Sequence, residues 1–158
     1  MHRIRLRYPW TKELRSERAA DQPLGDPRNP DDSPAPLDSH SKVNSQAVVG
    51  PQMVHVPEPD SQSLGEFVYT RKFNRPTGLD DATRIFLSIA GWQGKLLVVA
   101  VNQSPLKVES SAMGDRLRIP LETSLQAHNE LRIVLAPDGS KPARLSGEVQ
   151  LEIEDGLR

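Results

Sequence analysis

Residues 148–154 of the chain read Glu-Val-Gln-Leu-Glu-Ile-Glu, and this stretch indicates the fold class. Apolar and polar residues alternate with a period of two, which is typical of a β-strand with one face in the core. The same alternation recurs at residues 85–89, 117–121 and 131–135. Many short strands of this kind predict an all-β fold, either a sandwich or a closed barrel.

Four more segments are predicted to be strands. Glu66–Phe73 places its aromatic residues on one face, and the apolar run Leu96–Val101 is typical of a strand covered on both faces. Two earlier strands are predicted at Arg3–Tyr8 and Gln52–Val56. Turns rich in Gly, Pro, Asn and Ser separate the later strands, at residues 75–78, 90–94, 102–105 and 137–140.

The composition excludes several classes of protein. With 20 basic and 21 acidic residues the net charge is -1, so no strong field attracts nucleic acid or an anionic membrane. The absence of cysteine rules out disulfides and thiolate metal sites. The N-terminus has no apolar signal region, and no apolar run is long enough to span a bilayer. These features predict a soluble, cytoplasmic protein with neither a nucleic-acid nor a membrane partner.

One stretch near the N-terminus differs from the rest. Nine of the 14 prolines precede residue 60, and residues 18–45 contain few large apolar side chains. Such a stretch buries too little apolar surface to offset its ordering entropy. We therefore expect three parts: residues 1–13 form the first strand, residues 14–47 form a flexible, disordered Pro-rich insertion, and residues 48–158 form the remainder of one domain.

The order of short motifs resembles one known domain. A strand ending in Trp, a Val-Pro strand, a Tyr-x-Arg-x-Phe strand, a Gly-x-x-Gly turn, a Val-Asn turn and an Asn-x-Leu strand follow one another, at residues 4–10, 54–57, 69–73, 85–94, 101–103 and 117–133. This series resembles the N-terminal sugar-binding domain of the family 2 glycoside hydrolases, the β-galactosidase and β-glucuronidase family. Gln103 stands where that family has a glycine.

The resemblance implies an antiparallel jelly-roll β-sandwich of the galactose-binding-like kind. It also implies contacts with carbohydrate or with another protein domain. Because the family's catalytic carboxylates lie on a separate barrel domain, it further implies that this chain is a non-catalytic interaction or scaffold module. The alternative is a carbohydrate-binding module that uses the loops around Trp92.

We find no catalytic motif and no metal motif in the sequence. Glu152 and Glu154 would lie on one face of a strand at a spacing that suits an inverting glycosidase. We interpret them instead as the solvated side of that strand. The histidines, His2, His40, His55 and His128, have no metal-ligand spacing. No cofactor is predicted; a structural Ca²⁺ would need Asp80, Asp81 or Asp138.

Four residues are the candidate ligand-binding residues. Trp92 lies in a turn and offers a ring for stacking, with Gln93 beside it. Asn102 lies in the next turn. Arg71 is in phase with Tyr69 and Phe73, so it points toward the core, either as a ligand clamp or as a structural arginine bound to carbonyls or carboxylates at the end of the sheet.

Overall fold

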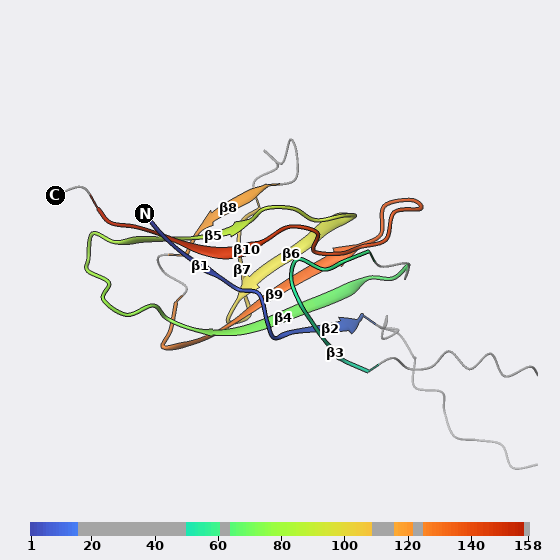
Figure 1. Ribbon diagram of the computed structural model, residues 1–158, viewed down its shortest axis with the longest axis horizontal. Coiled ribbons are helices and arrows are strands. Elements are labelled where there is room, and N and C mark those ends of the chain that lie inside the picture. Colours follow the sequence, from blue (N-terminus) through green and yellow to red (C-terminus); the bar gives the residue numbers. More distant parts are fainter. Residues whose placement is uncertain (16–49, 61–63, 109–115, 122–124, 157–158) are drawn as a thin grey trace, which may run out of the picture. The chain divides into compact units, whose positions relative to one another are not determined.

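The structure is a computed structural model that describes residues 1–15, 50–60, 64–108, 116–121 and 125–156. Two sheets make up the compact unit formed by Met1–Arg15 and Val49–Arg158 (Figure 1). The four-stranded sheet has the order β1 (His2–Arg5), β10 (Val149–Glu154), β5 (Arg84–Ile89) and β8 (Leu117–Pro120). The six-stranded sheet has the order β3 (Gln52–Val54), β2 (Trp10–Leu14), β4 (Phe67–Asn74), β9 (His128–Ala136), β6 (Lys95–Val101) and β7 (Ser104–Pro105).

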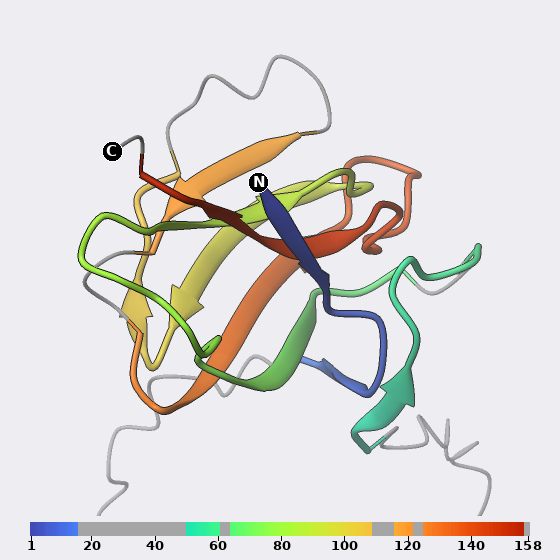
Figure 2. The same ribbon diagram turned by 60° about the vertical axis from the view of Figure 1, so that its left-hand side comes forward.

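All the strand pairs in the described part of the chain are antiparallel, and the two sheets face each other across a hydrophobic core (Figure 2). The all-β jelly-roll sandwich is therefore confirmed. None of the described residues forms a helix, so no helix there is a candidate for crossing a membrane. The Pro-rich insertion predicted at residues 14–47 lies almost wholly outside the described residues.

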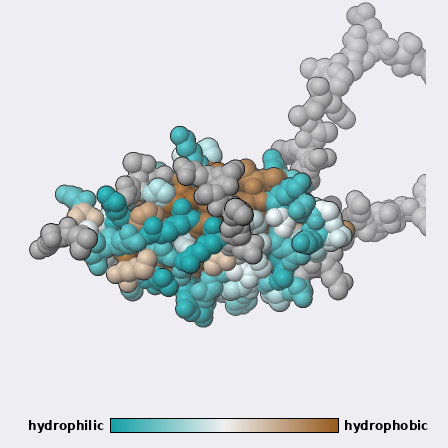
Figure 3. Space-filling view, turned by 90° about the horizontal axis from the view of Figure 1, so that it is seen from above, coloured by the Kyte–Doolittle hydropathy of each residue, from teal (hydrophilic) through white to brown (hydrophobic). Residues whose placement is uncertain are grey.

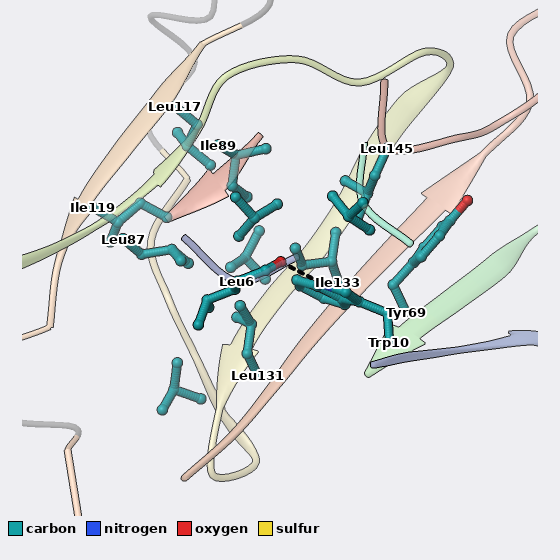
Figure 4. Packing of buried hydrophobic residues seen from close by; sticks show 14 of the residues in the cluster. Leu6, Trp10, Tyr69, Leu87, Ile89, Leu117, Ile119, Leu131, Ile133 and Leu145 are labelled. Carbon is teal, nitrogen blue, oxygen red and sulfur yellow. Dashed lines mark hydrogen bonds between the residues drawn. The ribbon is translucent and has the colours of Figure 1, made fainter. Parts of the chain in front are cut away.

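The alternating apolar residues form the core, as their period of two predicts. Leu87, Leu131 and Ile133 are fully buried between the sheets (Figure 4). Trp10 is also fully buried, and its indole N–H donates a 2.6 Å hydrogen bond to the carbonyl oxygen of Leu6. A buried tryptophan needs such a partner because an unsatisfied N–H inside the core is costly. Trp10 therefore anchors the first part of the chain to the core.

The predicted strand at Arg3–Tyr8 ends early, where the chain changes from one sheet to the other. β1 ends at Arg5 and pairs with β10, whereas β2 begins at Trp10 and pairs with β3 and β4. Leu6 and Trp10 are both buried, and the chain crosses from one sheet to the other between them. Tyr8 is consequently 50% exposed and stacks on His55 instead of joining the core. This crossing, which contains Pro9, interrupts the alternation of inward and outward side chains.

The apolar run in β6 is covered on both faces only in its second half. Val99, Ala100 and Val101 are buried, but Leu97 is 45% exposed. A β-bulge between Leu96 and Val98 shifts the register against β9 and changes which side chains point outward. The prediction of a fully covered strand was therefore wrong for the first half of β6.

The hairpin between β6 and β7 contains two residues in left-handed conformations. Asn102 has φ 51° and Gln103 has φ 68°, and Val101 pairs directly with Ser104 across them. A two-residue turn with positive φ at both positions is the turn that best matches the twist of a hairpin. The tight turn therefore forms although Gln103 stands where the resembling family has glycine.

We expect Gln103→Gly to raise the free energy of unfolding by about 0.5–1 kcal/mol. Left-handed φ costs a residue with a Cβ roughly 1–2 kcal/mol, and the extra unfolded-state entropy of glycine cancels only part of that gain. Urea unfolding at pH 7 measures the change. Asn102→Gly is the control and should destabilise the protein, because the Asn102 side chain accepts a hydrogen bond from the Glu130 N–H. A loss of stability in Gln103→Gly would contradict this account of the turn.

Candidate functional site

The four predicted binding residues lie at two separate places. Trp92 and Gln93 precede β6, and Asn102 follows it. A strand of this length separates its two ends by roughly 20 Å. Arg71 in β4 pairs with Leu131, which in turn pairs with Val101, so Arg71 is level with the Asn102 end of β6. The structure thus brings Arg71 and Asn102 together and leaves Trp92 and Gln93 at the other end.

At that other end, Gln93 and Arg144 are joined by main chain and side chain. Their backbones form an isolated β-bridge, and the Gln93 side-chain oxygen accepts a 2.8 Å hydrogen bond from Arg144 Nε. Trp92 is half-buried and packs against the hydrophobic core. Both side chains therefore support the turn before β6, and only part of the Trp92 ring is left for a ligand.

A groove of about 700 Å³ opens between the two sheets at the Arg71 end. Its volume lies in the range of small-molecule sites. The apolar floor includes Ile4 and Leu6 from the β1 region, Leu151 from β10 and Phe73 from β4. Polar side chains complete the lining: Arg5, Arg71, Lys72, Asn74, Asn102, His128, Asn129 and Glu130. An apolar floor with a few polar groups around it is typical of a ligand site.

Asn102 and Asn129 hold the wall of this groove in place. The Asn102 amide nitrogen donates a 2.9 Å hydrogen bond to Asn129 Oδ1, and the Asn102 side-chain oxygen accepts from the Glu130 N–H. Asn129, which is only 3% exposed, also bonds both backbone groups of Gln126 that face it. These contacts fix the β6–β7 hairpin to the start of β9. Asn102 is thus a structural residue of the groove wall.

Arg71 lies on the inner face of β4, as its phase predicted. Its Nη1 donates a 2.6 Å hydrogen bond to the carbonyl oxygen of Pro9. Partial burial lowers the pKa of the guanidinium, because the charged form loses hydration. This contact with a carbonyl is of the kind expected of a structural arginine, and the ligand-clamp interpretation stays a prediction.

A buried ionic cluster, which was not predicted from the sequence, lies near the Gln93 end. Lys12, only 7% exposed, donates a 2.6 Å hydrogen bond to Glu58 Oε1, and the Tyr69 hydroxyl donates to Glu58 Oε2. Burial, followed by the hydrogen bond and charge of Glu58, raises the pKa of the Tyr69 hydroxyl far above its ordinary value. Arg144 also donates to the Glu58 carbonyl oxygen at 2.9 Å. One signal was available, because Lys12 is in phase with buried Trp10 on β2.

The Glu152 and Glu154 pair is not a simple solvated face. Glu152 is 1% exposed although it lies on the outer side of the four-stranded sheet, where the coloured surface is mostly hydrophilic with an apolar patch near the middle (Figure 3). Arg118 Nε donates to it at 2.8 Å, while Arg116 and Arg3 approach to 3.5 and 3.8 Å. Arg118 also stacks on the Phe86 ring. The prediction of a solvated Glu152 was therefore wrong.

The arginines keep Glu152 ionised. Burial on its own would raise the pKa of this carboxyl, but the hydrogen bond and charge of Arg118, together with Arg3 and Arg116, outweigh burial and leave the pKa below its ordinary value of 4.5. A glycosidase acid needs the opposite, a raised pKa. Glu152 is thus unsuited to donate a proton near neutral pH.

We expect Glu152→Gln to lower the free energy of unfolding by about 1–3 kcal/mol at pH 7, because it removes charge-assisted hydrogen bonds from arginines that remain partly hydrated. The lowered folded-state pKa means that the wild-type advantage is complete above the unfolded-state pKa. It fades as the pH falls from 4.5 toward the lower folded-state value. Urea unfolding of both proteins between pH 3 and 7 measures this. A difference that does not shrink below pH 4.5 would contradict the assignment.

The candidate metal ligands are engaged elsewhere or isolated. The Asp80 carboxylate accepts hydrogen bonds from Thr83 Oγ1 at 2.6 Å and from the Ala82 N–H at 3.2 Å. These bonds, that of Thr83 foremost, lower the pKa of Asp80. His128 bonds Asn74 through Nδ1 at 2.9 Å, and His40 lies outside the described residues. Among the residues that the structure describes, no three His, Asp or Glu side chains form a metal-binding group.

Solved structures share this fold at low sequence identity. The β-glucuronidase of Faecalibacterium prausnitzii matches 98% of this chain with a TM-score of 0.63 and 13% identity. The β-glucuronidase of Bifidobacterium dentium, complexed with coumarin-3-O-glucuronide, matches 98% with a TM-score of 0.62 and 16% identity. The β-D-mannosidase of Dictyoglomus thermophilum matches 96% with a TM-score of 0.60 and 12% identity.

These matches cover only a fraction of each enzyme. The chain corresponds to 31%, 30% and 22% of the three matched chains, respectively. No protein-family model and no curated protein sequence matches this chain. The fold expected from the resemblance to the N-terminal domain of family 2 glycoside hydrolases is confirmed by the structural likeness. At this level of identity the likeness concerns the fold alone, because one fold serves many functions.

Proposed function

We propose that these 158 residues act as a non-catalytic binding module whose ligand site is the groove between the sheets at the Arg71 end. The observation that carries this proposal is the groove itself, which has the volume of a ligand site and combines an apolar floor with polar side chains. Glu152 and Glu154 are the two carboxylates whose spacing best suits glycoside hydrolysis. Three arginines keep Glu152 ionised, so it is a poor proton donor, and this supports a non-catalytic role.

Carbohydrate is the ligand class that we favour for this groove. Phe73 is half-buried and offers an apolar ring surface, while Asn74, His128 and Glu130 supply amide, imidazole and carboxylate groups around it. Sugars are recognised by this combination, since their C–H faces pack on rings and their hydroxyls both donate and accept hydrogen bonds. The solved structures that share the fold are glycosidases, which supports the same ligand class.

The alternative site around Trp92 stays a second proposal, because its half-buried ring still has an exposed part. Two sets of variants separate the two sites, as they lie at opposite ends of β6. Asn74→Ala and His128→Ala change exposed side chains of the groove, and Trp92→Ala changes the other end.

A glycan array followed by NMR titration of the hits tests the proposal. We expect a weak hit whose affinity falls at least threefold in Asn74→Ala or His128→Ala and stays unchanged in Trp92→Ala. The reverse pattern would move the site to Trp92. Turnover of aryl-glycosides by the purified protein, retained after repurification, would overturn the non-catalytic role.

A further inference from the structure

Arg71 has fewer partners than Arg144, which is the other half-buried arginine among the residues that the structure describes. Arg144 donates to Gln93, to the Glu58 carbonyl oxygen and to Asp60. Arg71, by contrast, has one hydrogen bond to a described residue, the Pro9 carbonyl oxygen, and its buried Nε–H has no hydrogen-bond partner. No carboxylate of the described residues forms an ion pair with it.

An arginine in this situation is energetically unusual. Buried polar groups are nearly always hydrogen-bonded, and an unpaired donor on a charged group costs more than a neutral one. An anion in the groove would stabilise the charged, partly buried guanidinium, because a guanidinium forms two parallel charge-assisted bonds with a carboxylate. The Nε–H is closed to solvent, so the Nη–H groups are the donors that Arg71 offers to an acceptor in the groove that it lines.

The remaining charges of the groove favour the same ligand. Arg5 and Lys72 line it along with Arg71, against the single carboxylate of Glu130. Arg5 is half exposed, and its Nη1 lies 3.6 Å from Glu148 Oε1. This ion pair reduces the contribution of Arg5 to the positive charge of the groove but does not reverse the sign of that charge. The lining thus carries more positive than negative charge, although the whole chain has a net charge of -1. β1, which carries Arg5, lies above β4, which carries Arg71, in both ribbon views (Figures 1 and 2).

We propose that the groove binds a carboxylate-bearing ligand and that Arg71 holds the carboxylate through its Nη–H groups. This inference rests on the proposed function, because it specifies the ligand of the same site. Two sources supply such a carboxylate, a sugar acid or an acidic peptide group. The apolar floor at Ile4, Leu6 and Phe73 then packs against the body that carries the carboxylate.

Pairs of acidic and neutral probes test the proposal on the full chain. D-glucuronate is compared with D-glucose, and N-acetyl-aspartate with N-acetyl-asparagine, by titration followed in ¹H–¹⁵N spectra. We expect the acid of at least one pair to bind at least tenfold more tightly than its neutral counterpart. Its binding should weaken as salt is raised. The pair that shows the difference identifies the source of the carboxylate.

Variants of Arg71 separate a direct role from a structural one. Arg71→Gln should weaken acid binding at least tenfold, and Arg71→Lys severalfold, since lysine keeps the charge but loses the fork. Lys95→Gln, which removes an exposed positive charge at the opposite end of β6, should change affinity less than threefold. The Arg71 Nε–H resonance of the wild type should shift on adding acid and stay unmoved on adding the neutral probe. This readout requires no variant, so it holds even if Arg71→Gln fails to fold.

Two negative results have different meanings. If acids and neutral probes bind equally and the Arg71 resonance does not move, the carboxylate inference is wrong while the binding role of the groove stands. If neither the four probes nor the glycan panel shifts any groove resonance, both the inference and the proposed function are wrong.

Discussion

Gly94→Ala is expected to lower the free energy of unfolding by about 3 kcal/mol. Gly94 has φ +91°, where a side chain strains the backbone by roughly 1–2 kcal/mol. A Cβ built there lies 2.3 Å from the carbonyl oxygen of Ala136, at the end of β9. Because that oxygen belongs to the backbone, the turn before β6 must move away from β9, which adds about 1–3 kcal/mol to the loss of stability.

The matched control for this prediction is Gly139→Ala. Gly139 also has positive φ, +58°, but a Cβ there has no neighbour within 4 Å. Its substitution should cost only the backbone strain, about 1 kcal/mol. Urea unfolding of both variants separates the strain from the close approach. Equal losses in the two variants would show that the contact with Ala136 is not limiting, and would contradict the tight approach of the turn to β9.

The sequence predicted the strands well where one face alone is buried. In β8 the apolar Leu117 and Ile119 are buried, and Arg118 between them is exposed, as the alternation predicted. This worked because the period of a strand is a local property. The prediction was wrong at Tyr8 and Leu97, where a crossing between sheets and a bulge change the phase. Neither event leaves a local signal as strong as the alternation itself.

The candidate site was predicted less completely, because its groups come from distant parts of the chain. Arg71 and Asn102 were identified individually, but only the pairing of β4, β9 and β6 brings them to one groove. The arginines around Glu152 come from β1 and from β8 and the residue before it, which are far apart in the sequence, so the sequence pattern alone did not indicate that this carboxylate is covered. Lys12 and Glu58 are similarly distant, 46 residues apart. Ionic contacts of this kind follow from topology and not from spacing along the chain.

The Lys12–Glu58–Tyr69 cluster should be the most costly ionic group to disrupt. Glu58→Ala is expected to lower the free energy of unfolding by about 3–5 kcal/mol, which is the usual cost of leaving a buried charge without its partner. The side chains of Lys12 and Glu58 are only 7% and 12% exposed, and Lys12 Nζ lies 4.2 Å from the centre of the Phe67 ring. Removing Glu58 leaves the Lys12 ammonium group beside the rings of Phe67 and Tyr69 without a carboxylate partner. The Tyr69 hydroxyl also loses its acceptor.

A double-mutant cycle tests this explanation by urea unfolding at pH 7. Lys12→Met combined with Glu58→Leu should recover most of the loss seen in Glu58→Leu alone, since replacing a buried pair by apolar side chains is often close to neutral. Lys95→Met is the control for an exposed pair: Lys95 lies 3.9 Å from Asp138, with both side chains more than half exposed, and should cost less than about 1 kcal/mol. If Glu58→Ala costs no more than Lys95→Met, the cluster contributes no more than a surface ion pair. In that case the Lys12 ammonium group must be hydrated in solution. The difference in free energy of unfolding between Glu58→Ala and Lys95→Met therefore measures how well the cluster is shielded from solvent.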